Sequence, residues 1–161
     1  MFIATGTGVV PFWSMINYVF EEGWDEADGE TRDVYLVLGS SWRDDLAYHE
    51  EWREMDDERD NFHYAPTLSR ESVLSDWEGE TDYVQQVFLK CLDEGRIDAD
   101  ELPGRLGGFV GEEVTDLGNP DLDPAELDVF ICGIGVMANM VREVADHSGI
   151  PERHRHVESY G

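Results

Sequence analysis

Short apolar runs alternate with amphipathic segments along the chain, and this alternation predicts the secondary structure. Apolar runs at residues 2–4, 34–38 and 129–132 predict strands, and the run at 34–38 is typical of a strand buried on both faces of a parallel sheet. Residues 62–68 are expected to form a further strand. A last short strand is expected in the tail, at 153–161. Amphipathic spacing predicts helices at about 11–22, 44–55, 83–92 and 136–147.

Strands that alternate with helices predict an α/β fold with right-handed crossovers. We therefore expect one doubly wound domain over residues 1–161, with a parallel sheet of about five strands and helices on both faces. The segment at about 95–126 is acidic and rich in Gly and Pro, which indicates mostly loop, with a lid or an insertion as alternatives. A shorter polar loop is expected at 69–82.

The charge of the chain is strongly one-sided. Thirty-seven carboxylates stand against 11 Lys and Arg, the net charge is −26, and Lys90 is the single lysine. The acids are dispersed among apolar segments, which favours a surface adapted to high salt over a charge-matched basic partner. Nucleic acid is a poor candidate partner for so negative a chain.

Several other classes of protein are disfavoured. Cys91 and Cys132 are too few for a disulfide framework, and no apolar run approaches the length of a membrane span. Residues 1–10 lack the basic start of a secretory signal, so a cytoplasmic location is expected. His154 and His156 lack companion ligands, so no metal site is predicted.

The turn Gly6-Thr7-Gly8 follows a predicted strand and precedes a predicted helix. Glycines there let the backbone approach a pyrophosphate, while the helix N-terminus supplies N–H donors. Spacing alone is a weak indication, because Pro11 stands where the usual dinucleotide fingerprint has a third glycine. A plain strand-to-helix turn is the alternative.

Polar residues after the second and third strands indicate which nucleotide would bind. The second strand ends in Gly39-Ser40-Ser41, without the acid that reads a ribose 2′-hydroxyl in NAD sites. Ser69-Arg70 after the third strand suits a 2′-phosphate, with Arg43 as another contributor. NADP is therefore favoured over NAD, although a surface ion pair is the alternative role for either arginine.

Six short motifs, taken together, resemble the nucleotide-binding domain of the ferredoxin:NADP reductase superfamily. In chain order they are Gly6-Thr7-Gly8-Val9-Val10-Pro11-Phe12, Asp45-Leu46-Ala47-Tyr48, Ser69-Arg70-Glu71, Tyr83-Val84-Gln85, Cys132-Gly133-x-x-x-Met137 and Glu158-x-Tyr160. Each motif is weak or moderate alone, but the ordered set spans nearly the whole chain. The resemblance implies a ferredoxin reductase-like nucleotide-binding fold.

The resemblance also implies roles for individual residues. The pyrophosphate and the nicotinamide side would be held by Thr5, Gly6, Thr7, Gly8 and Pro11. Ser69 and Arg70 would bind the 2′-phosphate, while Tyr83 would stack on adenine with Gln85 beside it. For Tyr83, packing into the core is the alternative.

The reacting centre would lie where the fourth strand ends. Cys132, supported by Gly133 and Met137, would set packing and polarity around the transferred hydride without a covalent intermediate. A small core residue is the alternative for Cys132. The family places the C-terminal aromatic, here Tyr160, against the flavin ring, and a carboxylate, here Glu158, near the reacting centre. These three residues are the candidate catalytic group.

The flavin-binding half of such enzymes has no counterpart in these 161 residues. We therefore expect an NAD(P)H-binding half of a flavoprotein oxidoreductase, which exchanges hydride with FAD from a missing domain or partner. Ferredoxin or another electron carrier is the expected electron-transfer partner. A fragment, a separate subunit and a stand-alone, non-catalytic NADP(H)-binding module remain alternatives; an apolar patch near Gly6, Cys132 and Tyr160 would favour the first two.

The charge generates a prediction about salt. The thermal unfolding midpoint should rise between dilute buffer and molar KCl, because a Debye length of roughly 3 Å at 1 M screens the repulsion between carboxylates. Circular dichroism melting curves over a KCl series would measure it. A midpoint that does not rise would contradict the adaptation to high salt.

Overall fold

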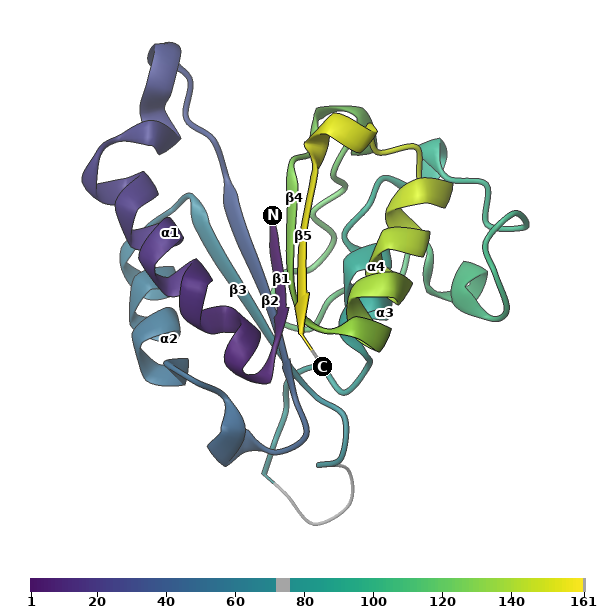
Figure 1. Ribbon diagram of the computed structural model, residues 1–161, viewed down its shortest axis with the longest axis horizontal. Helices are drawn as coiled ribbons and strands as arrows, with labels where there is room; N and C mark the ends of the chain where they lie inside the picture. Colours follow the sequence, from purple (N-terminus) through teal and green to yellow (C-terminus); the bar gives the residue numbers. More distant parts are fainter. Residues whose placement is uncertain (72–75, 161) are drawn as a thin grey trace.

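The computed structural model describes residues 1–71 and 76–160, so part of the expected polar loop and Gly161 lie outside the described residues. Five strands form one sheet in the order β3-β2-β1-β4-β5, and every neighbouring pair is parallel (Figure 1). The strands are β1 Phe2–Thr5, β2 Val34–Ser40, β3 Phe62–Leu68, β4 Val129–Ile134 and β5 Arg155–Tyr160. The predicted fold class is confirmed.

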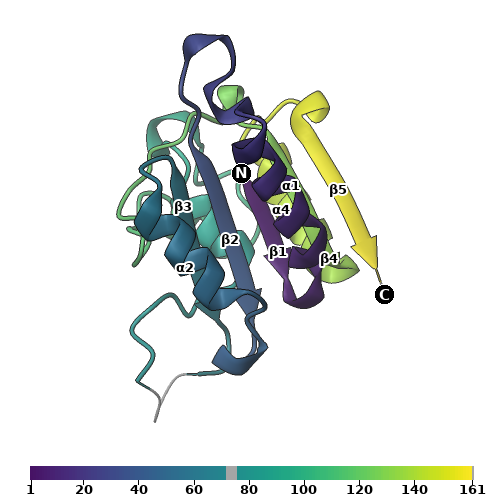
Figure 2. The same ribbon diagram turned by 90° about the vertical axis from the view of Figure 1, so that its left-hand side faces the viewer.

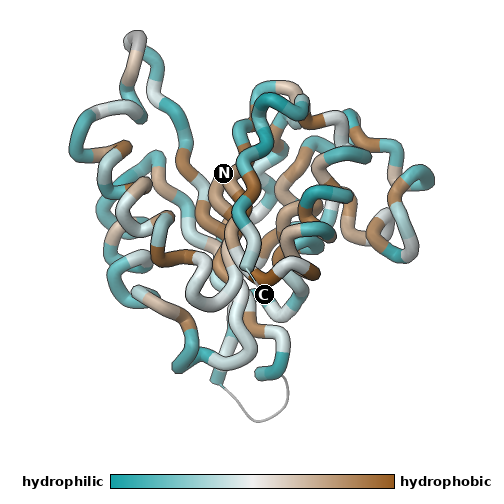
Figure 3. Tube along the Cα trace, in the orientation of Figure 1, coloured by the Kyte–Doolittle hydropathy of each residue, from teal (hydrophilic) through white to brown (hydrophobic). Residues whose placement is uncertain are grey.

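Helices cover both faces of the sheet. On one face lie α1 (Val9–Glu21) and α2 (His49–Glu58), and on the other α3 (Val84–Lys90) and α4 (Gly135–His147) (Figures 1 and 2). Each layer has its own apolar core, so the central strands carry buried residues on both faces. The hydropathy of the backbone trace follows this layering, with apolar residues along the strands (Figure 3). Within the described chain, no helix has the length and apolar character that crossing a bilayer requires.

The second helix begins later than its amphipathic pattern predicted. A helix was expected at about 44–55, but residues Arg43–Asp45 form a separate 3₁₀ turn, and α2 starts only at His49. Between them Leu46 is extended and buried, and Tyr48 has a left-handed φ of 59°. Burial of Leu46 in the core therefore interrupts the helix.

The acidic segment at 95–126 lacks long regular elements, as predicted, but it is packed against the helical layer of α3 and α4. It contains short 3₁₀ turns at Leu106–Phe109 and Pro124–Glu126. Ile97, Leu102 and Val114 are buried in the same core as α3 and α4. These apolar side chains fix the segment against α3, so its acids are carried on a packed surface.

Close backbone approaches bring the carboxyl ends of the strands together. A Cβ atom added at Gly8 would lie 2.2 Å from the Cys132 carbonyl oxygen, and one at Gly39 would lie 2.5 Å from Val84 Cγ1. At Gly133 a Cβ would lie 2.5 Å from Thr5 Oγ1. At Gly8 the clash would be with backbone, so glycine is required there, whereas at Gly39 and Gly133 a Cβ would displace neighbouring side chains.

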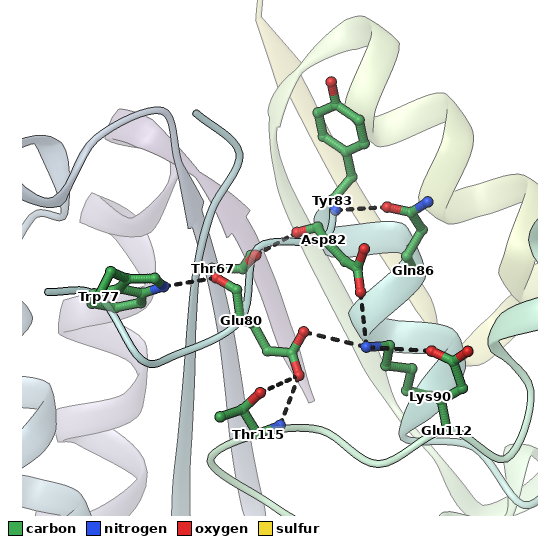
Figure 4. A network of polar contacts seen from close by, with 9 residues as sticks. All are labelled: Thr67, Trp77, Glu80, Asp82, Tyr83, Gln86, Lys90, Glu112 and Thr115. Carbon is green, nitrogen blue, oxygen red and sulfur yellow. Dashed lines mark hydrogen bonds and ion pairs between the residues drawn. The ribbon is translucent and has the colours of Figure 1, made fainter. Parts of the chain in front are cut away.

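The single lysine of the chain lies inside an acidic cluster at the end of α3. The Lys90 Nζ atom lies 2.8 Å from Asp82 Oδ2, 3.3 Å from Glu80 Oε2 and 3.6 Å from Glu112 Oε2 (Figure 4). The other Glu80 oxygen accepts hydrogen bonds from Thr115 N at 2.7 Å and Thr115 Oγ1 at 2.8 Å. Lys90 and Glu80 are both buried, so their charges are removed from water together.

This cluster fixes the chain that leads from β3 into α3. The Glu80 carbonyl oxygen accepts hydrogen bonds from Leu68 N at 3.0 Å and Trp77 Nε1 at 2.9 Å. Thr67 Oγ1 donates to the Asp82 carbonyl oxygen. Burial opposes the charged form of Lys90, but hydrogen bonds and charge from Asp82 and Glu80 outweigh it and raise its pKa. The ammonium therefore stays charged and holds this segment in place.

Removing the lysine should destabilise the fold. Lys90→Met leaves Glu80 buried without its cation, so the free energy of unfolding should fall by about 3–5 kcal/mol. Urea titrations at constant KCl would measure it, with Arg142→Met, at an exposed position of α4, as the matched loss of one positive charge. The stabilisation should fade as pH rises above 10.5, the ordinary pKa of lysine, because the folded-state pKa is raised.

A double variant separates the charge from the packing. Lys90→Met combined with Glu80→Gln removes both buried charges and keeps an acceptor for Thr115. The double variant should therefore be more stable than Lys90→Met alone. Equal small losses for Lys90→Met and Arg142→Met would contradict a structural role of the cluster.

Candidate functional site

A cleft of about 800 Å³ opens at the carboxyl edge of the sheet, where β1, β2, β3 and β4 end. Its walls come from the turn after β1, the segments that follow β2 and β3, and the first residues of α3 and α4. The carboxyl edge of a parallel sheet is the common ligand site of such folds, and this volume is within the range of about 300–1,000 Å³ for small-molecule sites.

The turn Gly6–Gly8 forms one wall of the cleft, and α1 begins directly after it. Gly6 and Thr7 line the cleft, and Gly6 has a φ of 52°, which favours glycine. No side chain caps α1, and its first turn contains no acidic residue. The positive end of α1 therefore lies beside the cleft without a capping side chain, although Val9 N donates to the Gly6 and Thr7 carbonyl oxygens and Pro11 has no N–H to offer a ligand.

Tyr160, the last residue of β5, contacts the end of β1 and the Gly6–Gly8 turn. Tyr160 Oη donates to the Thr5 carbonyl oxygen at 3.2 Å and lies 3.1 Å from Thr7 Oγ1. Its side chain lines the cleft and is 41% exposed. Beneath it, Thr5 Oγ1 is buried without a hydrogen-bond partner among the described residues. The aromatic ring and an unsatisfied hydroxyl therefore lie beside the same turn.

The start of α4 forms the neighbouring wall. Ile134 is the N-cap residue and has no side-chain acceptor for the N–H groups of the first turn, which again contains no acid. Ile134, Val136, Met137 and Met140 line the cleft, and the first two are 54% and 70% exposed. This end of the cleft therefore combines a second uncapped helix N-terminus with exposed apolar side chains.

The far end of the cleft lies where β2 and β3 finish. Ser40, Ser41, Ser69 and Arg70 line it together. Ser69 N donates to the Ser40 carbonyl oxygen at 3.0 Å, and Ser69 Oγ donates to the same oxygen at 3.3 Å. The structure therefore groups the hydroxyls and the arginine as the sequence predicted.

The two candidate arginines have different surroundings. Arg70 is exposed and makes no ion pair within the described part of the chain. Arg43 does not line the cleft; its N–H donates to Glu71 Oε2 at 3.2 Å, and its Nη1 lies 3.7 Å from Asp76 Oδ1. Arg43 therefore matches the surface ion pair that was its alternative role.

The start of α3 supplies the aromatic side of the cleft. Tyr83 is its N-cap residue and is 61% exposed, so it is not packed into the core. Tyr83 N donates to Gln86 Oε1 at 2.7 Å, which belongs to a capping box and fixes the backbone (Figure 4). Gln85 also lines the cleft, although only 4% of it is exposed.

Five predicted site residues do not line the cleft: Gly8, Pro11, Cys132, Gly133 and Glu158. Cys132 is buried beside Ala4 in the sheet, and Glu158 is its neighbour on β5. Burial, with the nearby Glu158 charge, raises the pKa of the Cys132 thiol. The thiol is therefore neutral and hidden near neutral pH.

Sequence reasoning missed some cleft residues because their positions depend on how the chain turns back. Asp45 and Ala47 line the cleft although they lie well past the end of β2. Thr67 and Asp82 also line the cleft. Their segments are joined by the hydrogen bond from Thr67 Oγ1 to the Asp82 carbonyl oxygen and by the ion pair of Asp82 with Lys90. The Asp-Leu-x-Tyr motif was the available indication for Asp45. Across the described ranges, no group of three His, Cys, Asp or Glu side chains is arranged to hold a metal ion.

Comparisons with known proteins agree on the family. The chain matches the family model described as "Oxidoreductase NAD-binding domain" over residues 2–143. Ferredoxin--NADP reductase B of Sorangium cellulosum (strain So ce56) is 32% identical over 161 residues, which cover 99% of this chain and 53% of that protein. The chain thus spans about half the length of this curated relative.

Solved structures show the same fold. Ferredoxin-NADP+ reductase from Plasmodium falciparum with 2′P-AMP aligns with a TM-score of 0.59 and 21% identity, over 99% of this chain and 52% of that one. The CS-b5R domains of human Ncb5or in the NAD+ form align with a TM-score of 0.64 and 16% identity, over 96% and 35%. These findings confirm the resemblance found in the motifs: the chain belongs to the oxidoreductase NAD-binding domain family, the nucleotide-binding domain of the ferredoxin:NADP reductase superfamily.

Proposed function

We propose that the cleft binds NAD(P)H and that the chain acts as the nucleotide-binding half of a flavin-dependent oxidoreductase. One observation carries this proposal: α1 and α4 both begin at the cleft without a capping side chain and without an acid in the first turn. In a chain of net charge −26, residues 1–20 contain no charged side chain at all. Uncapped helix N-termini in an uncharged region favour an anion such as a pyrophosphate.

The lining residues fit the parts of one dinucleotide. Gly6, Thr7 and the start of α1 would hold the pyrophosphate, since glycine permits a close backbone approach. Ser69 and Arg70 would bind a 2′-phosphate, and the exposed ring of Tyr83 would stack on adenine. Ser69 would have to release its 3.3 Å bond to the Ser40 carbonyl oxygen in order to donate to phosphate.

The reacting end would lie between Tyr160 and the start of α4. Bound NAD(P)H supplies the hydride, and FAD from a flavin-binding domain or partner accepts it. Met137 and Ile134 would exclude water beside the nicotinamide, and the neutral, buried Cys132 would shape the site from behind. Glu158 would place a negative charge near this region. None of these roles requires a covalent intermediate.

An apolar rim supports a partner domain over a stand-alone module. Five apolar or aromatic side chains at the starts of α1 and α4, within α4 or at the ends of β4 and β5 are between 38% and 70% exposed. They are Val10, Ile134, Val136, Met140 and Tyr160. Exposed apolar side chains grouped around a cleft are typical of a surface that another domain covers. A module that only sequesters NADP(H) would favour a polar rim. Ferredoxin, named in the Sorangium relative, is the proposed electron carrier.

Nucleotide titrations test the proposal. By calorimetry, in about 2 M KCl to screen the charge, the chain should bind NADP+ saturably and more tightly than NAD+. Arg70→Ala should raise the NADP+ dissociation constant roughly 10- to 100-fold, because charge-assisted hydrogen bonds to the 2′-phosphate are lost. NAD+ lacks that phosphate, so its dissociation constant should change less than about twofold.

Arg142→Ala is the matched control, since it removes an exposed positive charge on α4. It should leave both dissociation constants nearly unchanged. Equal losses of NADP+ and NAD+ affinity in Arg70→Ala would argue against its role at the 2′-phosphate. Failure of the folded wild-type chain to bind either nucleotide would contradict an autonomous nucleotide site.

A further inference from the structure

Asp45 lines the cleft although it does not directly follow a strand in the sequence. Three charged side chains line the cleft within the described residues: Arg70, Asp45 and Asp82. Asp82 Oδ2 lies 2.8 Å from the ammonium of Lys90, so its charge is compensated. Asp45 is exposed and forms no ion pair in the part of the chain that is described. Its carboxylate is therefore available to a ligand.

The position of Asp45 is fixed by its neighbours. Asp45 N donates to the Trp42 carbonyl oxygen at 3.1 Å, and Leu46, the next residue, is buried in the core. The Ala47 carbonyl oxygen accepts a hydrogen bond from Trp52 Nε1 at 3.2 Å. A buried side chain and two hydrogen bonds therefore hold the 3₁₀ turn and its exit against the sheet, with Asp45 toward the cleft.

The same turn is tied to the segment that carries Arg70. Arg43 N donates to the carboxylate of Glu71, the residue after Arg70, at 3.2 Å. Ser40, at the end of β2, is bonded through its carbonyl oxygen to Ser69. Two links therefore join the segments after β2 and β3, and Asp45 and Arg70 line the cleft from these joined segments.

We propose that Asp45 is a specificity-determining residue that lowers the preference of the cleft for a 2′-phosphate over a 2′-hydroxyl. This inference rests on the proposed nucleotide site. A carboxylate accepts a hydrogen bond from a ribose hydroxyl, the role that an acid after the second strand has in NAD sites. The same negative charge repels a 2′-phosphate. The charge of Asp45 therefore opposes that of Arg70, which narrows the preference for NADP+ over NAD+.

Neutralising the carboxylate should change the two affinities in different ways. In Asp45→Asn, the NADP+ dissociation constant should fall by about five- to tenfold, because one unit charge near the doubly charged phosphate is removed. The NAD+ dissociation constant should stay the same or rise by up to about threefold, since an amide is a weaker acceptor than a carboxylate. The ratio of the two constants is therefore the diagnostic quantity.

The experiment measures both dissociation constants by calorimetry for the wild-type chain, Asp45→Asn, Asp45→Ser and Asp44→Asn. Asp44 is the matched control, because it is exposed on the same 3₁₀ turn, carries the same charge and does not line the cleft. Titrations should use the lowest KCl concentration at which circular dichroism shows the chain folded, since salt screens the interaction.

A shift toward NADP+ in both Asp45 variants, with no more than about a twofold shift in Asp44→Asn, would support the proposal. An unchanged ratio in the Asp45 variants, or an equal shift in Asp44→Asn, would overturn it while leaving the nucleotide site intact. A wild-type chain that is folded and binds neither nucleotide would overturn the nucleotide site and this inference together.

Discussion

The close approach of the first turn to the end of β4 is the constraint on which the site depends. Gly8 lies so close to the Cys132 carbonyl oxygen that no side chain could be present, while a side chain at Gly133 would displace the side chains of Thr5 and Met137. This contact sets the start of α1 beside the start of α4, so two uncapped helix N-termini share one cleft. A larger residue at Gly8 would force the start of α1 away from β4 and so disturb the proposed anion site.

The negative charge of the chain opposes the binding of an anion in this cleft. A net charge of −26 opposes binding of any anion, yet the acids are absent from residues 1–20 and from the first turns of α1 and α4. By contrast, the first turn of α2 contains Glu50 and Glu51. Acids are therefore kept away from the two helix starts that we propose to bind an anion, although Asp45 and Asp82 also line the cleft.

The sequence predicted the fold well where hydrophobic runs were long. The runs at 34–38 and 129–132 predicted β2 and the core of β4, because strands buried on both faces tolerate few polar residues. The start of α2 was missed because burial of Leu46 overrides helix periodicity. The cluster around Lys90 was not predictable, since its acids come from separate segments that only the folded chain unites.

Cleft residues were predictable where a motif ends a strand and unpredictable where the chain returns to the cleft after a turn. Ser69 and Arg70 directly follow β3, so strand order alone places them at the carboxyl edge. Asp45 reaches the same edge only through the 3₁₀ turn and the anchor at Leu46. The residues directly after the second strand contain no acid. The sequence alone could not predict that the chain turns after β2 and brings Asp45 to the same edge of the sheet. In the proposed site, cofactor preference would depend on the uncompensated charges of the cleft wall, Arg70 against Asp45, because Asp82 is paired with Lys90.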